Sequence, residues 1–138
     1  MTVVVSGCGS SSSEDRAAPA AKPKPKPKTV SVADATVTFQ DAVITFDLGG
    51  GCPDQAPGAC WEEMQSVMEP ARTLRKAMNG EKSVGADHWT EAYALIAKME
   101  KGIGVGRDRG ATHLLTNRPD VLGSAHELSD WLDANPIA

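Results

Sequence analysis

The stretch CWEEMQSVMEPARTLRKAM, residues 60–78, carries the clearest helix pattern in the chain. Glu62 and Glu63 lie in its first turn, where negative charge suits the positive end of the helix macrodipole. Arg75 and Lys76 lie in the last turn, where the opposite sign is favoured. Its apolar residues recur every three or four positions and form one stripe, which predicts an amphipathic helix packed in a core. They are Trp61, Met64, Met68, Ala71, Leu74 and Met78.

Pro70 interrupts this predicted helix. A proline in a helix interior removes one backbone donor, so we expect a kink near residues 66–68 or a break. The methionines of the stripe also suit a promiscuous binding groove, but core packing is the simpler interpretation. The helix is expected to end at Asn79-Gly80.

Two further helices are predicted downstream. Asp87 is a suitable N-cap for a helix that runs to Lys101 and stops at Gly102. The last helix is expected to begin at Ser124, which forms a capping box with Glu127, and to end at Asn135-Pro136. The residues expected to face inward are Trp89, Ala92, Tyr93, Ile96 and Met99 from the first helix, and Leu128, Trp131 and Leu132 from the second.

Residues 31–48 allow two interpretations. Val, Ile, Thr and Phe favour strand by propensity, which would give an α+β fold with an N-terminal β-hairpin. However, Val32, Ala35, Phe39, Val43 and Phe46 recur at helical spacing. A capping box is expected at the start of this stretch and a glycine stop at residues 49–51. Because a lone hairpin is marginally stable, we predict an all-α fold, a four-helix up-and-down bundle.

A long connection, residues 102–123, precedes the last predicted helix. Loops of this length in compact domains are usually functional or disordered. Glycines followed by Arg107, Arg109 and Arg118 make a candidate anion-binding site through backbone amides and guanidinium groups. The alternative is a flexible connection that wraps over the end of the bundle, because the glycine spacing does not match a dinucleotide loop.

Near the start of the chain, Val5-Ser6-Gly7-Cys8 is followed by Gly9 and four serines. This motif resembles the lipobox of bacterial lipoproteins, and the chain is similar to small uncharacterised lipoproteins of high-GC Gram-positive bacteria. The resemblance implies cleavage before Cys8 and a diacylglycerol on its sulfur. It also implies a lipid-anchored protein on the extracytoplasmic face of the cell membrane.

Residues 1–8 are interpreted as the remnant of a signal peptide with its lipobox. Only seven residues precede Cys8, and they contain no Lys or Arg. A secretory signal needs a basic segment followed by an apolar segment of about 7–15 residues. We therefore expect that Met1 is a misplaced start and that the true signal is encoded upstream.

Residues 9–29 are predicted to be a disordered linker, first Ser/Ala-rich and then a Lys-Pro alternation. Proline and like-charge repulsion favour polyproline II, at about 3.1 Å per residue. The lysines are candidates for contact with anionic lipid or a wall polymer, and a plain solvated stalk is the simpler interpretation. They are Lys22, Lys24, Lys26 and Lys28.

Of the three cysteines, Cys8 stands apart from Cys52 and Cys60. If Cys8 is lipidated, Cys52 and Cys60 remain as a pair, which an oxidising exterior would allow to close as a disulfide. Free thiols and zinc are the alternatives. A C-x7-C spacing with no second Cys/His pair nearby matches zinc sites poorly, so no metal is expected.

Charge and motifs limit the function classes. Residues 1–29 have a net charge of +3 and residues 30–138 a net charge of −7, and an acidic domain without a basic patch argues against nucleic acid. His88, His113 and His126 lack metal-ligand spacing. No nucleophile motif, reactive-cysteine context or redox C-x-x-C occurs, so no catalytic residue, cofactor or enzymatic activity is predicted.

The function that these patterns favour is a non-enzymatic binding or interaction module of the cell envelope, with an unknown protein partner. Two alternatives come from other classes. One is an envelope enzyme or accessory protein with an anion site at residues 102–118. The other is a small-ligand carrier with a cleft between the helix of Met64 and Met68 and the helix of Trp89 and Tyr93.

Overall fold

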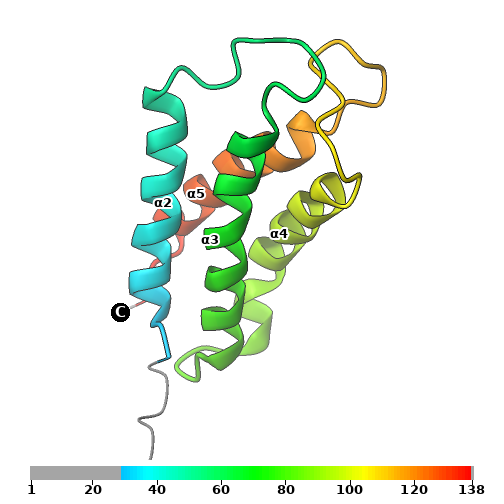
Figure 1. Cartoon of the computed structure of the whole chain (residues 1–138). Coiled ribbons are helices and arrows are strands. Elements are labelled where there is room, and N and C mark those ends of the chain that lie inside the picture. The colour runs from blue at the N-terminus through cyan, green and yellow to red at the C-terminus, as the bar shows by residue number, and fades with distance from the viewer. Residues whose placement is uncertain (1–28, 138) are drawn as a thin grey trace, which may run out of the picture.

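The computed structural model of the protein describes residues 29–137 as four α-helices that alternate in direction (Figure 1). Among these residues there is no β-strand, so the all-α prediction is confirmed and the alternative hairpin is not supported. Each helix packs against its neighbours around the bundle, and α5 closes it against both α4 and α2. The helices are α2 (Val32–Leu48), α3 (Trp61–Gly80), α4 (Thr90–Ile103) and α5 (Ser124–Ala134).

Helix α2 begins where the sequence predicts it. The Ser31 side chain accepts a hydrogen bond of 3.0 Å from the backbone N–H of Asp34, as in a capping box. Four of its predicted inward residues are buried, and Phe46 is partly buried against the core. The β-branched residues therefore form a helix here because the period of the apolar residues matches a helix face, which overrides strand propensity.

Helix α3 supplies the centre of the core and runs through Pro70 without interruption. The predicted alternative of a break at Pro70 is therefore wrong. Its predicted stripe is buried except for Trp61, which is half-exposed at the first position. Side chains packed to less than 2% exposure form the middle of the bundle, and seven of the largest come from α2, α3 and α4. They are Phe39, Met64, Met68, Leu74, Met78, Ile96 and Met99.

The predicted start and stop of α4 are wrong. Asp87 does not cap the helix, because it lies inside a 3₁₀ turn, η1 (Ala86–Trp89), which leads directly into Thr90. Gly102 does not end the helix, because it lies within the last turn of α4, where it is buried. Glycine is needed at this position because a side chain has no room: a Cβ atom there would lie 2.5 Å from a methyl group of Val121.

The predicted capping box of α5 is also wrong. A π-helical turn, η2 (Pro119–Gly123), runs into α5, so Ser124 has helical backbone angles rather than those of an N-cap. Its hydroxyl is buried and has no partner among the described residues. Leu128 and Leu132 face the core as predicted, and Trp131 is partly buried against it.

Polar contacts join the helices at their surfaces. Arg72 of α3 donates two hydrogen bonds to the Glu100 carboxylate of α4, at 2.8 and 3.0 Å, and Arg75 adds a third at 3.1 Å. His126 of α5 places Nδ1 2.8 Å from the Leu122 carbonyl and Nε2 2.8 Å from the Asp47 carboxylate. Partial burial opposes charge on this imidazole, but these two acceptors together raise the pKa of His126 above its usual value.

None of the helices in residues 29–137 combines the length and the hydropathy that a bilayer crossing requires. The predicted lipidation at Cys8, the linker of residues 9–29 and its four lysines fall outside the described residues, apart from Thr29. They therefore stay predictions.

The enclosed glycine of α4 gives a test of the packing. Gly102→Ala should lower the free energy of unfolding by about 1–3 kcal/mol, because the added methyl group overlaps Val121. Gly80→Ala is the matched control, since a Cβ at the end of α3 meets nothing within 4 Å, and it should raise stability by about 0.4–1 kcal/mol. Urea denaturation measures both. Equal effects of the two substitutions would contradict the close packing of α4 on η2.

Candidate functional site at the loop end

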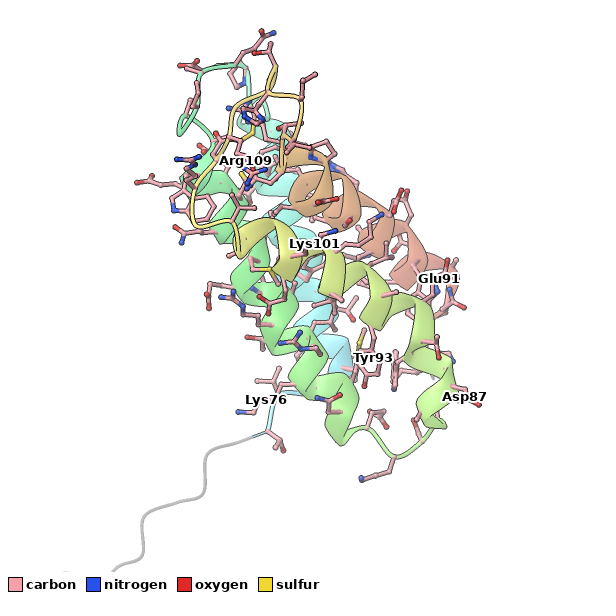
Figure 2. All side chains as sticks on the ribbon, turned by 90° about the vertical axis from the view of Figure 1, so that its right-hand side faces the viewer. Lys76, Asp87, Glu91, Tyr93, Lys101 and Arg109 are labelled. Carbon is pink, nitrogen blue, oxygen red and sulfur yellow. A yellow bond between two sulfur atoms is a disulfide. The ribbon has the colours of Figure 1, made fainter. Side chains whose placement is uncertain are left out.

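Two long loops meet at one end of the bundle, and we call residues 49–60 and 104–118 together the loop end (Figure 1). Backbone hydrogen bonds join them directly. Gly58 N–H donates to the Asp108 carbonyl at 2.9 Å, and Ala111 N–H donates to the Gln55 carbonyl at 3.0 Å. In Figure 2 Arg109 marks this end, far from Lys76 and Asp87 at the other end of the bundle.

Asp108 is the centre of the loop end. Its side chain is fully buried and accepts hydrogen bonds from two backbone N–H groups, that of Cys60 at 2.8 Å and that of Gly110 at 2.8 Å. The same carboxylate accepts two more from Arg118, Nε to Oδ1 at 2.9 Å and Nη2 to Oδ2 at 2.8 Å. A carboxylate with four donors is satisfied at both oxygens, which offsets much of the cost of burying its charge.

Arg118 reaches across both loops. Besides its two bonds to Asp108, Nη1 donates to the Asp54 carbonyl at 2.9 Å and Nη2 donates to the Ala56 carbonyl at 3.0 Å. The hydrogen bonds from Arg118 are the main reason that the pKa of Asp108 falls to about 2, and those from Gly110 and Cys60 lower it further against the effect of burial. The carboxylate raises the pKa of Arg118 in turn.

Asn117 holds the shape of the second loop. Its side-chain amide donates to the Gly102 and Arg107 carbonyls, both at 2.8 Å, and its side-chain oxygen accepts from the backbone N–H of Arg109 at 3.0 Å. The residue is buried, so these bonds satisfy polar groups that water does not reach. Asn117 therefore ties the end of α4 to the loop that follows it.

Gly110 is required where the two loops touch. Its φ of 92° lies in the left-handed region, which residues with a Cβ atom rarely adopt. A Cβ atom there would also lie 3.0 Å from the Gln55 carbonyl oxygen and 3.0 Å from the Pro57 nitrogen. Both the conformation and the close approach of the loops therefore demand glycine.

The Cys52–Cys60 pair closes the first loop. The two sulfur atoms are within bonding distance, and the Cα atoms lie 5.7 Å apart, which is the usual separation for a disulfide. The predicted pairing is thus confirmed. The backbone N–H of Cys60 donates to Asp108 of the second loop. The disulfide therefore closes the first loop at a residue that also contacts the second loop.

The three arginines predicted to bind an anion are placed differently from one another. Arg118 is buried and donates to groups of the chain itself, so the bidentate contact expected with an anion is made with Asp108. Arg109 is half-buried and donates to the Leu115 carbonyl. Arg107 is exposed. Arg118 therefore already directs its donors at groups of the chain itself, and an anion site at the loop end stays a prediction.

Few groups at the loop end are available for chemistry. The carboxylate of Asp108 is ion-paired and enclosed, and His113 is exposed with Nδ1 accepting from the backbone N–H of Leu115. Among residues 29–137 no three His, Cys, Asp or Glu side chains gather closely enough to hold a metal ion. His88 follows Asp87 in η1, at the opposite end of the bundle (Figure 2), and lies beside the rings of Trp89 and Trp131.

The cleft required by the carrier hypothesis is filled by side chains. Met64 and Met68 are buried in the core, as is Trp89 at the end of η1, and Tyr93 of α4 donates from its hydroxyl to the Asn79 side chain at 2.6 Å. Three surface cavities lie between α2 and α3 or between α2 and α5, and none of the three is lined by either methionine. The methionine stripe therefore packs the core.

The sequence patterns did not predict the roles of Asp108 and Asn117. An aspartate between two arginines, in a glycine-rich loop too long to leave its backbone unpaired, was the available signal. Its partner Arg118 is ten residues away, and the carbonyls that complete the site belong to the other loop.

Comparisons of the chain with models of protein families, with curated proteins and with solved structures find no match. Its function is therefore inferred from its own residues.

Replacement of the central carboxylate tests the site. Asp108→Asn should lower the free energy of unfolding by about 3–5 kcal/mol at pH 7, because it leaves the Arg118 charge buried without an opposite charge beside it. Asp87→Asn, at an exposed position in η1, is the control and should change stability by less than about 0.5 kcal/mol.

The pH dependence of stability has a defined sign. Because the pKa of Asp108 is about 2 in the folded chain and lower than when unfolded, its contribution is complete above the unfolded pKa and is lost as pH falls through about 2. The difference in stability between the native chain and Asp108→Asn should therefore shrink between about pH 4 and pH 2. A difference that stays constant over this range would contradict the ion pair.

The disulfide has a separate prediction. Reduction, or Cys52→Ser with Cys60→Ser, should lower the free energy of unfolding by about 2–3 kcal/mol, since it releases a nine-residue loop in the unfolded chain. Thermal unfolding with and without a reductant measures the change, and Cys8→Ser is the control that keeps the pair. An unchanged melting temperature after reduction would show that the loop end does not depend on this bond.

Proposed function

We propose that the protein is an exported, lipid-anchored module of the cell envelope that acts by binding another protein and not by catalysis. Cys8 carries the lipid in this proposal, and the linker holds the helical domain away from the membrane. The supporting observation is the division of the cysteines. Cys52 and Cys60 form a pair, and the third cysteine of the sequence, Cys8, lies in the motif that resembles a lipobox.

The disulfide supports export. Disulfides persist in oxidising compartments and are rare in the reducing cytoplasm. The Cys52–Cys60 bond closes a loop that also carries the backbone donor to Asp108, so its loss would loosen the loop end. A domain whose fold includes such a bond is suited to the extracytoplasmic face.

The point at which the linker joins the helical domain supports a domain whose loop end faces away from the membrane. Helix α2 begins at the end of the bundle opposite the loop end (Figure 1). The linker therefore joins the domain at the end opposite the two loops, and in this proposal the loops and the sides of the bundle are the surfaces offered to a partner. The four linker lysines are proposed to meet anionic lipid or wall polymer, because the domain itself is acidic.

The alternatives have less support. An envelope enzyme with an anion site at residues 102–118 would need free guanidinium groups, whereas Arg118 is committed to Asp108 and two carbonyls. A small-ligand carrier would need an open cleft beside Met64 and Met68, whereas both side chains are enclosed. A filled core with polar loops bonded to one another favours a binding module.

Mass spectrometry of the native protein tests the anchor. We expect the mature chain to begin at Cys8, with a diacylglycerol on its sulfur and Cys52 joined to Cys60. Cys8→Ala should remove the lipid mass and shift the protein from the membrane fraction to the soluble fraction. The melting temperature of the helical domain should stay the same, since the disulfide is retained. An unmodified first segment with three reduced thiols would contradict the proposal.

A further inference from the structure

The outer face of α2 carries an apolar stripe that the bundle does not cover. Val37, Ile44 and Leu48 are exposed at 58, 52 and 85%. Together with Asp34 and Asp41 they occupy positions 34, 37, 41, 44 and 48, which alternate in steps of three and four. This is the spacing with which one helix seats along another. We call these five residues the α2 outer stripe.

The rest of this face lacks the side chains that usually cover a solvated helix. Over its 17 residues, α2 contains no Lys, Arg or Glu, and its other exposed positions include Ala33, Thr38 and Thr45. By contrast, α3 exposes charged residues such as Glu62, Glu69 and Lys76. Long charged side chains lose rotamer freedom when they are covered, and protein interfaces are depleted in Lys and Glu. The composition of α2 therefore suits a covered surface.

The charge of the stripe limits what can cover it. The ionised side chains of α2 are three aspartates, and Asp47 already faces His126. Among the described residues, neither Asp34 nor Asp41 forms an ion pair. A second copy of this chain, seated on the same stripe, would place aspartate against aspartate, which is unfavourable. An anionic lipid surface would be repelled in the same way.

We infer that the α2 outer stripe binds an amphipathic helix of a partner protein, with apolar residues along one side and Lys or Arg beside them. The apolar side chains would cover Val37, Ile44 and Leu48, and the basic side chains would pair with Asp34 and Asp41. Helix α2 lies at the edge of the bundle, with α3 on one flank and α5 on the other, so no other helix of residues 29–137 covers its outer side (Figure 1). The stripe extends about 21 Å, which four turns of a partner helix match.

This inference rests on the proposed binding role and names the partner class for it, but it does not require the lipid anchor. The test accordingly uses the full chain without lipid. If the test fails, the lipid anchor is still tested separately by mass spectrometry of Cys8. The probe is a synthetic peptide of three heptads, with leucine along one face and lysine on both sides of it. A matched peptide carries glutamate in place of lysine.

Fluorescence anisotropy of the labelled peptides measures binding. The lysine peptide should bind, and the glutamate peptide should bind at least about tenfold more weakly because it meets Asp34 and Asp41 with like charge. Val37→Ser with Ile44→Ser should weaken the lysine peptide at least about tenfold, since it removes the apolar contact at the centre of the stripe.

A control with altered charges distinguishes binding at the α2 outer stripe from nonspecific attraction of a basic peptide to an acidic protein. Asp34→Asn with Asp41→Asn should weaken the lysine peptide severalfold, and Asp34→Asn keeps the backbone N–H that Ser31 caps. Glu127→Gln with Asp130→Asn removes the same charge from exposed positions of α5 and should leave binding nearly unchanged. Equal losses in both pairs, or no loss with Val37→Ser and Ile44→Ser, would overturn the inference.

Two other occupants are distinguished by direct measurements. Sedimentation of the chain alone should give a monomer, and binding to vesicles of anionic phosphatidylglycerol should not depend on the stripe. A dimer that Val37→Ser with Ile44→Ser dissociates would assign the stripe to a second copy. Vesicle binding that the same variant abolishes would assign it to lipid. Either result would overturn the partner helix.

Discussion

The buried ion pair between Asp108 and Arg118 is the interaction on which one end of the molecule depends. Two loops without regular structure meet there, and their backbone groups need partners that no helix supplies. Asp108 accepts from both loops and Arg118 donates to both. A buried ion pair stabilises a fold only when its geometry is good and its remaining donors and acceptors are satisfied. The loop end meets this condition.

Other features of the loop end add to the same constraint. Gly110 permits the loops to approach, Asn117 bonds the second loop to the end of α4, and the Cys52–Cys60 bond closes the first. One loop connects α2 to α3, and the other leads from α4 toward α5. The contacts between the two loops therefore fix the α2–α3 pair relative to the α4–α5 pair. The core of methionines and Phe39 then fills the space between them. A rigid bundle with bonded loops presents its outer faces, including that of α2, in one arrangement.

The helices could be predicted because their information is local. The apolar period of α3 and the Ser31 cap of α2 lie within a few residues of the structure that they determine. The predicted caps at Asp87 and Ser124 were wrong, because a 3₁₀ turn and a π-helical turn extend each helix backward, and residue type alone does not show such turns. Gly102 was misread as a stop for a related reason, since its role depends on Val121, which comes from a distant turn.

The candidate site was harder to predict than the fold. The cysteine pair followed from the count and spacing of three residues. The arginines of the long connection were predicted to bind an anion, and the carboxylate that Arg118 binds belongs to the chain itself. Sequence spacing does not show that Arg118 meets the carbonyl of Asp54, 64 residues away. Local patterns do not encode contacts between loops.

Hydrogen exchange of two backbone amides tests the central role of the ion pair most directly. The amides of Cys60 and Gly110 donate to the Asp108 carboxylate, and the amide of Ala71 lies in the middle of α3. In the native chain all three should exchange slowly. In Arg118→Met the first two should lose protection together while Ala71 keeps most of its own. Fast exchange of Cys60 and Gly110 in the native chain, or unchanged protection in Arg118→Met, would contradict the account.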